Sequence, residues 1–346
     1  MIRANVRPYQ LEFKNPVLTS RGPMLFKNGY FIILKKENKI GIGECSFIEG
    51  LSRDKLDKLD TALKYTCLNI DKWASLKDEL LIDFPSLVFG FEMAFLSLKA
   101  KDICSLFDND FSNQKSHIPI NGLIWMGSEA FMRQQILDKK EKGFNCIKLK
   151  VGAINFNEEC KLLELIRNEY ENVEIRLDAN GAFDSKNVKS RIQTLSQFKI
   201  HSIEQPIKPN HHKLLQEICA DNIIDIALDE ELIYITENER KTALLEIVKP
   251  QFIIIKPSML GGFEESEKWI EISNRLNIEW WATSALESNV GLNAIAQWVA
   301  SKNINKTQGL GTGELYKNNI TSPLTIENGS IFLDSNKTWD IDVLLN

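Results

Sequence analysis

The chain has 346 residues, with 42 Lys and Arg against 47 Asp and Glu, which gives a net charge of −5. Hydrophobic residues make up 43% and charged residues 26%, as in ordinary globular proteins. This composition excludes a disordered chain, a collagen-like fibre and a membrane bundle, and it argues against a nucleic-acid partner. The length fits two domains, or one barrel of about 250 residues with an added domain.

The cysteines and the N-terminus indicate a cellular compartment. Six cysteines are scattered without a CxxC pair, which indicates reduced thiols rather than a disulfide framework or a zinc site. The first residues lack the apolar core of a signal peptide, and no apolar run approaches the roughly 18 residues of a membrane span. We therefore expect a soluble, cytoplasmic protein without a membrane partner.

The first third of the chain has the pattern of an α+β domain. Residues 1–13 predict a strand, and residues 29–47 predict a hairpin that turns at Glu37 and Asn38. Helical patterns follow at 54–80 and 86–100. The Gly- and Pro-containing run 20–29, between the strand and the hairpin, predicts a mobile loop.

After His117, short apolar runs alternate with amphipathic stretches. The runs lie about 20–30 residues apart, at 118–124, 145–151, 174–180, 200–206, 223–230, 251–257, 278–285 and 307–313. Apolar strands that alternate with helices indicate a parallel sheet buried on both faces, and eight of them indicate a closed α/β barrel. An open doubly wound sheet is the alternative, but no Gly-x-Gly-x-x-Gly motif follows the first run. The tail from about Ser322 returns to short β elements, which we expect to pack against the N-terminal domain.

Charged residues stand at the C-terminal ends of five of these apolar runs, where the active site of such a barrel lies. Because side chains alternate along a strand, all of them are predicted to point into the barrel mouth. They are Lys148, Lys150, Asp178, Glu204, Asp229 and Lys256. Three converging carboxylates repel one another unless a cation binds between them, and carboxylate ligands suit Mg²⁺ or Mn²⁺.

Two lysines would flank this metal from opposite walls, since the strands of Lys150 and Lys256 are four steps apart in an eight-stranded ring. The metal would bind a substrate carboxylate and neutralise the enediolate that forms when the α-proton leaves. A lysine is the expected base, because all four histidines lie at strand starts or on a helix. The neighbouring Lys148 and the metal would lower the pKa of this lysine. A single lysine is more often salt-bridged, and each acid alone could cap a helix, but neither alternative explains the ordered set.

This ordered set resembles the enolase superfamily, specifically its muconate-lactonizing-enzyme subgroup. The subgroup signature is Lys-x-Lys, then Asp, Glu and Asp as metal ligands, then a lysine on strand six, here spaced 25–28 residues apart. The resemblance implies a modified TIM barrel, (β/α)7β, over 117–316, with an α+β capping domain over 1–116 that is joined by the segment 317–346. It also implies that Lys150 takes the proton, that Lys256 stabilises the enediolate, and that Lys148 tunes Lys150.

Within the subgroup the chain looks most like the o-succinylbenzoate synthases of menaquinone biosynthesis. The motifs are 283–288 (TSALES), 309–313 (GLGTG) and 20–22 (SRG). The resemblance implies a Mg²⁺-dependent syn-dehydration of 2-succinyl-6-hydroxy-2,4-cyclohexadiene-1-carboxylate, a lyase reaction on a small carboxylate. Strand-seven serines could hydrogen-bond its succinyl carboxylate, and a Gly-rich strand end offers N–H groups to an anion. The expected substrate contacts are Arg21, Arg176, Asn180, Ser284, Ser288, Gly311 and Thr312, with Asn180 also orienting the metal ligands.

Other activities of the subgroup remain alternatives: N-succinylamino-acid racemase, dipeptide epimerase and muconate cycloisomerase. Dipeptide epimerases usually carry an Asp-x-Asp pair at strand eight, which the sequence Gly311-Thr312-Gly313 lacks. Racemisation needs two bases, and the opposed Lys150 and Lys256 permit it. A barrel that only binds a ligand is disfavoured, because no lysine or acid of the set is missing. The sequence leaves the oligomeric state open.

Overall fold

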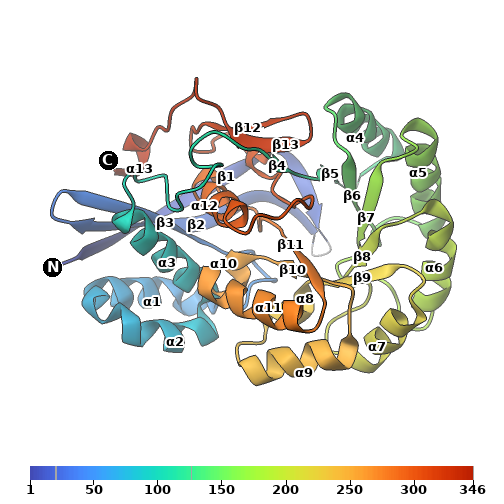
Figure 1. Ribbon diagram of the computed structural model, residues 1–346, viewed down its shortest axis with the longest axis horizontal. Helices are drawn as coiled ribbons and strands as arrows, with labels where there is room; N and C mark the ends of the chain where they lie inside the picture. Colours follow the sequence, from blue (N-terminus) through green and yellow to red (C-terminus); the bar gives the residue numbers. More distant parts are fainter. Residues whose placement is uncertain (20–21, 126, 346) are drawn as a thin grey trace.

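The computed structural model describes residues 1–19, 22–125 and 127–345. The chain begins with a three-stranded antiparallel sheet of β1 (Arg3–Thr19), β2 (Gly22–Lys36) and β3 (Lys39–Ser46), in that order. The helices α1 (Leu56–Leu68), α2 (Trp73–Asp83) and α3 (Pro85–Lys99) follow; α1 and α3 lie against this sheet, and α2 packs against α3 (Figure 1). The turn predicted at Glu37 and Asn38 joins β2 to β3, and a short 3₁₀ turn (Ile70–Lys72) interrupts the helix predicted over 54–80.

The loop predicted at 20–29 is wrong for the part that the structure describes. Residues 22–29 belong to β2 and pair with β1, with Met24 opposite Val17 and Gly29 opposite Tyr9. A Cβ at Gly29 would come within 2.4 Å of the Tyr9 ring. This glycine therefore marks a close approach between strands rather than a turn. Residues 20 and 21 lie outside the described residues.

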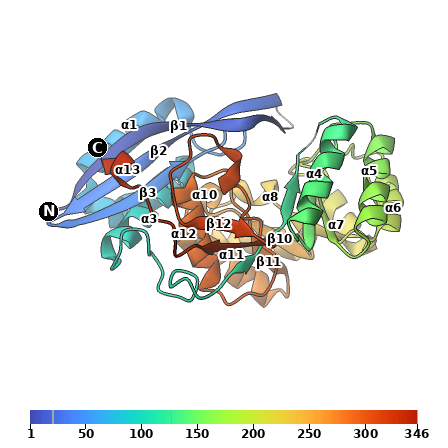
Figure 2. The ribbon, with the colours of Figure 1, turned by 90° about the horizontal axis from the view of Figure 1, so that it is seen from above.

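The second half of the chain forms a curved parallel sheet in the order β11-β10-β9-β8-β7-β6-β5, with helices on its outer face (Figures 1 and 2). The strands are β5 (Gly122–Ile124), β6 (Cys146–Lys150), β7 (Glu174–Asp178), β8 (Ser202–Glu204), β9 (Asp225–Leu228), β10 (Phe252–Ile255) and β11 (Glu279–Ala282). The helices that follow them in turn are α4 (Glu129–Glu141), α5 (Phe156–Glu169), α6 (Val188–Leu195), α7 (His212–Asp221), α8 (Glu230–Ile233) with α9 (Asn238–Val248), α10 (Pro257–Leu260) with α11 (Phe263–Arg275), and α12 (Asn289–Ala300).

The predicted eighth strand is reduced to two bridged residues. Gln308 pairs with Ile120 and Gly309 with Thr283, both in parallel. Backbone hydrogen bonds from Gln308 N to Pro119 O (2.8 Å) and from Gly309 N to Ala282 O (2.7 Å) connect β11 to the residues before β5. The ring therefore has the predicted (β/α)7β form, closed by a very short last segment. The first predicted strand is split, because β4 (Ile118–Pro119) pairs with β13 instead.

The alternation of side chains separates two cores. Outward residues of the strands, such as Ile147, Leu177 and Ile203, join the large apolar core that the helices cover. Inward residues of β9, β10 and β11 form a small separate cluster of Ala227, Phe252, Ile254 and Trp281. This apolar cluster lies inside the barrel and precedes the charged residues at the strand ends.

The C-terminal segment returns toward the N-terminal sheet. The strands β12 (Leu324–Glu327) and β13 (Ser330–Leu333) form a sheet with β4, and α13 (Asp342–Leu345) follows. The Arg7 guanidinium donates to Leu345 O at 2.8 Å, which places α13 beside β1 (Figure 2). The assignment of 1–116 and 317–346 to one capping domain stays a prediction. No helix in the described part of the chain has the length and apolar character needed to cross a membrane.

The contact between β3 and α3 allows a test of the N-terminal packing. A Cβ at Gly43 would lie 1.9 Å from Gly90 O and 2.8 Å from Ala94 N. We expect Gly43→Ala to lower the free energy of unfolding by about 1–3 kcal/mol, because backbone rather than a flexible side chain must move. Urea denaturation measures this change. The matched control is Gly311→Ala, whose Cβ would meet no atom closer than 3.4 Å; equal stability of the two variants would contradict the packing.

Candidate active site

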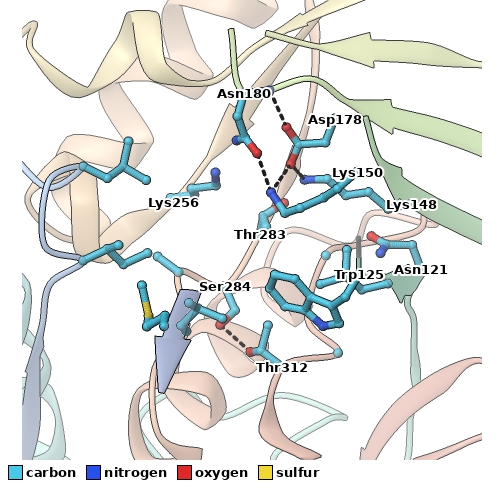
Figure 3. Close-up of a pocket in the computed structure, with 18 residues that line it drawn as sticks. Asn121, Trp125, Lys148, Lys150, Asp178, Asn180, Lys256, Thr283, Ser284 and Thr312 are labelled. Atoms are coloured by element: carbon cyan, nitrogen blue, oxygen red, sulfur yellow. Dashed lines mark hydrogen bonds and ion pairs between the residues drawn. The ribbon is translucent and has the colours of Figure 1, made fainter. Parts of the chain in front are cut away.

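A cavity opens at the C-terminal ends of the barrel strands (Figure 3). Its walls come from the ends of β5, β6, β7, β10 and β11 and from the segment 309–312, whereas the predicted ligands Glu204 and Asp229 do not line it. The N-terminal part of the chain closes one side through Met24, Ile48 and Leu51. Lysines and an acid gather at one end of the cavity, and hydroxyl groups gather at the other (Figure 3). The polar lining residues are Asn121, Lys148, Lys150, Asp178, Asn180, Lys256, Thr283, Ser284 and Thr312.

Strand register brings the charged side chains together. Lys150 pairs with Asp178 across β6 and β7, and Asp178 pairs with Glu204 across β7 and β8. Neighbouring strands are about 4.8 Å apart, so side chains at matching positions on one face touch or nearly touch. Lys150, Asp178 and Glu204 thus share one inner surface.

The lysines and carboxylates alternate in one continuous chain of ion pairs. Asp178 Oδ2 lies 3.0 Å from Lys150 Nζ and 2.9 Å from Lys148 Nζ. The Lys148 ammonium also lies 2.6 Å from Glu204 Oε2, and Lys256 Nζ lies 3.7 Å from Glu204 Oε1. The same Lys256 ammonium donates to Asp229. Lys148 and Lys256 therefore each bridge two carboxylates.

Burial and charge act in opposite directions on these groups. Burial disfavours the ammonium of Lys148, but the carboxylates of Asp178 and Glu204 outweigh burial and raise its pKa. Asp178 responds in the same way, because Lys148 and Lys150 outweigh its burial and hold its pKa well below the usual range. At Glu204, burial and the charge of Asp178 prevail and raise the pKa to about 7. Burial also raises the pKa of Asp229, against the opposing charge of Lys256.

Asn180 fixes the side chain of Lys150. Its Oδ1 accepts from Lys150 Nζ at 2.6 Å, and its Nδ2 donates to Glu230 Oε1 at 3.0 Å. The Trp125 ring lies on another side of the same ammonium, 6.0 Å from ring centroid to nitrogen. Lys256 enters from the opposite wall of the cavity (Figure 3). The two lysines therefore face one space from different sides.

The three carboxylates fit the chemistry of a divalent cation. Asp178, Glu204 and Asp229 stand on successive strands and offer only oxygen, which hard cations prefer. Both Glu204 oxygens are buried, and neither accepts a well-formed hydrogen bond from the residues that the structure describes. Within the same residues no three His, Cys, Asp or Glu side chains are grouped as closely as the ligands of one metal ion. The lysine ammonium groups bridge these carboxylates instead.

The hydroxyl end of the cavity contains Ser284, Thr312 and the nearby Gly311. Ser284 Oγ and Thr312 Oγ1 are 2.6 Å apart. Behind them, outside the cavity lining, lies the fully buried Glu287, which accepts a hydrogen bond from Ser284 Oγ at 2.5 Å. Glu287 lies in the motif 283–288 on which the family resemblance rests, but the sequence alone assigned it no role.

Two of the expected substrate contacts, Ser288 and Arg176, do not line the cavity, and a third, Arg21, is not among the described residues. Ser288 Oγ is buried as the N-cap of α12 and donates to Glu44 Oε2, which lies on β3. The Arg176 guanidinium donates to Glu174 Oε1 (2.7 Å) and Thr307 O (2.9 Å), and it stacks over Trp281 at 4.1 Å. Both side chains are satisfied by structural partners and do not line the cavity. Arg21 falls outside the described residues.

Asn121 and Thr283 are further cavity residues. The sequence alone did not point to Asn121, and it named Thr283 only as part of the motif 283–288. Asn121 Oδ1 and Thr283 Oγ1 are buried without a hydrogen-bond partner among the described residues, and both side chains line the cavity. Asn121 N donates to Gln308 O, and Thr283 pairs with Gly309, so the positions of both residues depend on the short segment that completes the barrel.

Comparisons with known proteins agree with this geometry. Residues 132–337 match the family model "Enolase C-terminal domain-like", and residues 1–98 match "MenC, N-terminal domain". An o-succinylbenzoate synthase of Desulfotalea psychrophila is 41% identical over 93% of this chain and 96% of its own length. The chain belongs to the o-succinylbenzoate synthase family of the enolase superfamily. The resemblance inferred from the Lys-x-Lys signature is thus confirmed.

Solved structures extend the comparison. The crystal structure of MenC from Desulfotalea psychrophila superimposes with a TM-score of 0.84 at 38% identity, covering 96% of this chain and 99% of that one. A dipeptide epimerase from Enterococcus faecalis, complexed with Mg and L-Leu-L-Tyr, gives 0.82 at 20% identity and covers 98% of both chains. The match to the epimerase shows only a shared fold, while the match to MenC supports membership of the same family.

The position of Ser288 gives a prediction about stability. We expect Ser288→Ala to lower the free energy of unfolding by about 1–2 kcal/mol, because it removes a helix cap and a buried partner of Glu44. Thermal or urea denaturation measures the loss. Ser185→Ala, at an exposed serine, serves as the control. Unchanged stability of the Ser288 variant would contradict its structural role.

Proposed function

We propose that this enzyme is an o-succinylbenzoate synthase, a lyase that removes water from 2-succinyl-6-hydroxy-2,4-cyclohexadiene-1-carboxylate. The observation that carries the proposal is the opposed set of Lys148, Lys150 and Lys256 beside Asp178 at one end of the cavity (Figure 3). Glu204 and Asp229 form ion pairs with Lys148 and Lys256. Membership of the family supports the choice of substrate.

Asp178, Glu204 and Asp229 would hold a Mg²⁺ ion, with Mn²⁺ as the other candidate. When bound, such an ion neutralises the negative charge that develops on the ring carboxylate and competes with the lysines for the acidic side chains. The lysine ammonium groups that bridge the acids in this structure are then available to the substrate.

Lys150 is proposed as the base. As a free amine its Nζ takes the proton on the ring carbon that bears the carboxylate, and this C–H bond breaks. The resulting ammonium returns the proton to the leaving hydroxyl group as the C–O bond breaks, so water departs and the ring becomes aromatic. Asn180 holds the lysine in place through its 2.6 Å hydrogen bond.

Lys256 and Lys148 act as cations rather than as bases in this proposal. The carboxylates around Lys256 outweigh its burial and raise its pKa, which keeps its ammonium charged. From the opposite wall it stabilises the charge that Lys150 creates. Lys148, buried between Asp178 and Glu204, would contact the ring carboxylate. Ser284, Gly311 and Thr312 would receive the succinyl group, and a role of Arg21 stays a prediction.

Turnover of the hydroxycyclohexadiene acid tests the function directly. We expect purified protein with Mg²⁺ to convert the diene to an aromatic acid, followed by the change in ultraviolet absorbance. EDTA should abolish the reaction, and added Mg²⁺ should restore it, because the three acids need the ion to bind the substrate carboxylate. A folded, metal-loaded protein without turnover would contradict the proposal.

The base assignment predicts a large kinetic effect. Lys150→Ala should lower kcat at least about 10³-fold, because it removes the amine that takes the proton. The exposed Lys64→Ala is the control and should leave kcat unchanged. Circular dichroism of both variants checks that they are folded. Normal turnover of Lys150→Ala would overturn the assignment.

The raised pKa of Glu204 predicts how metal affinity depends on pH. Burial and the charge of Asp178 raise this pKa to about 7, so the carboxyl group is protonated below that pH and ionised above it. A proton and Mg²⁺ compete for the same oxygens, so affinity should fall about tenfold for each pH unit below 7 and level off above it. Titration calorimetry with Mg²⁺ measures this; an affinity independent of pH would contradict it.

Racemisation of N-succinyl amino acids or dipeptides is the second candidate, because Lys150 and Lys256 face the cavity from opposite sides. Exchange of the α-proton with solvent deuterium in these compounds, in the absence of diene turnover, would favour it.

A cytoplasmic location is also proposed, supported by six cysteines that are all free.

A further inference from the structure

A buried acid stands behind the hydroxyl end of the cavity. Glu287 follows β11, is fully buried and does not line the cavity. Its Oε1 accepts from Ser258 Oγ at 2.5 Å, and its Oε2 accepts from Ser284 Oγ at 2.5 Å and from Ala285 N at 2.7 Å. Ser284 and Thr312 connect it to the cavity, and both of these residues line the cavity wall (Figure 3).

The hydroxyl protons along the hydrogen-bonded series Thr312, Ser284 and Glu287 can be assigned. A hydroxyl group has one proton to donate. With Glu287 ionised, Ser284 donates its proton to Glu287, so Ser284 must accept from Thr312 at the 2.6 Å contact. The Thr312 proton then points away from the cavity, and both hydroxyls present only lone pairs to a ligand. An anionic group would meet lone pairs here, with a buried negative charge behind them.

We propose that Glu287 is a positioning residue that takes up one proton when an anionic substrate tail binds, which turns the Thr312 hydroxyl into a donor. The incoming proton binds Oε2, which then donates to Ser284 Oγ while its remaining lone pair still accepts from Ala285 N. Ser284 then donates to Thr312 Oγ1, and the Thr312 proton points to the tail. One proton enters at Glu287 and one donor appears at the cavity wall, while no covalent bond of the ligand changes.

The surroundings of Glu287 support the protonated state. Burial raises its pKa, against the hydrogen bonds from Ser258 and Ser284, and the charge of Glu44 on β3 raises it further. Two further titratable groups also act on Glu287: Lys27 on β2, whose ammonium opposes protonation, and Tyr316 after the 3₁₀ turn Gly313–Leu315. Glu44 accepts from Ser288 and Gly291 on α12 and from Tyr9, and so lies outside the chain of hydroxyls to the cavity.

This inference rests on the proposed function, because it takes the substrate to carry a second carboxylate on its succinyl tail. The lysine end of the cavity serves the ring carboxylate, and the hydroxyl end serves the tail (Figure 3). Binding of the tail should therefore be coupled to protonation, while binding of the ring carboxylate at the lysines should not involve Glu287.

Calorimetry in buffers of different ionisation enthalpy tests this coupling through the protons taken up on binding. The probes, each added to the Mg²⁺-loaded protein, are o-succinylbenzoate, 3-benzoylpropionate, which has the tail but no ring carboxylate, and benzoate, which has no tail. Measurements run from about pH 6 to about pH 9. For the two tailed probes we expect uptake to rise with pH to about one proton, and affinity to fall about tenfold per pH unit above the Glu287 pKa. Benzoate should show no uptake that depends on Glu287.

Three variants complete the test. Glu287→Gln should abolish the uptake for both tailed probes and make their affinity independent of pH. If that variant fails to fold, Thr312→Val removes the terminal donor instead and should also abolish the uptake while weakening the tailed probes. Glu44→Gln, at a neighbouring buried acid, should keep the uptake and shift its midpoint to lower pH.

The outcomes separate this inference from the proposed function. Equal proton uptake in wild type and Glu287→Gln, no uptake in wild type, or no binding of 3-benzoylpropionate at any pH would overturn the role of Glu287. Turnover of the hydroxycyclohexadiene acid by wild type is a separate measurement, and its absence would overturn the proposed function alone.

Discussion

Three acids buried at neighbouring strand ends are the constraint on which the site depends. Carboxylates in such a place repel one another and lose their hydration, so they require cations within contact distance. The chain supplies three lysines on the same inner face, and the resulting order of charges alternates from Lys150 to Asp229. The strand register fixes this order, because a shift of one residue in β6 would turn both of its lysines toward the helices.

The apolar packing below the site makes such a concentration of charge possible. Ile254, Trp281 and their neighbours lie inside the barrel, and Arg176 stacks on Trp281 with its donors occupied by Glu174 and Thr307. Water has little room beneath the lysines, so their interactions with the acids act in a medium of low polarity. Met24, Ile48 and Leu51 cover another side with apolar groups from the N-terminal part.

Periodicity was sufficient to predict the barrel and its charged face. Each strand is a short local apolar run, and the alternation of side chains follows from backbone geometry alone, so Lys148, Asp178 and Glu204 could be placed from their positions in the runs. The same reasoning misjudged Arg176, which shares the inner face with Asp178 but lies lower in the barrel. It also misjudged Ser288, whose partner Glu44 lies far away in the sequence. It gave no role to Glu287, whose partner Ser258 is likewise distant. The glycines of 22–29 led to the wrong prediction of a loop. The Tyr9 ring that excludes a side chain at Gly29 comes from another strand, which the local sequence does not show.

Gln308, together with Gly309, joins the two edges of the barrel sheet. Gln308 accepts from Asn121 N through its carbonyl and donates to Pro119 O through its amide, while its side-chain Oε1 accepts from Ala282 N. Gln308 thus connects the residues before β5 to the end of β11, and its side-chain oxygen takes the place of a backbone acceptor that a full strand would supply. Thr312 lies four positions further along, so the anchoring of Gln308 also sets where the hydroxyl of Thr312 meets Ser284. The circumference of the barrel and the recognition of a ligand at that wall are consequently determined at the same point.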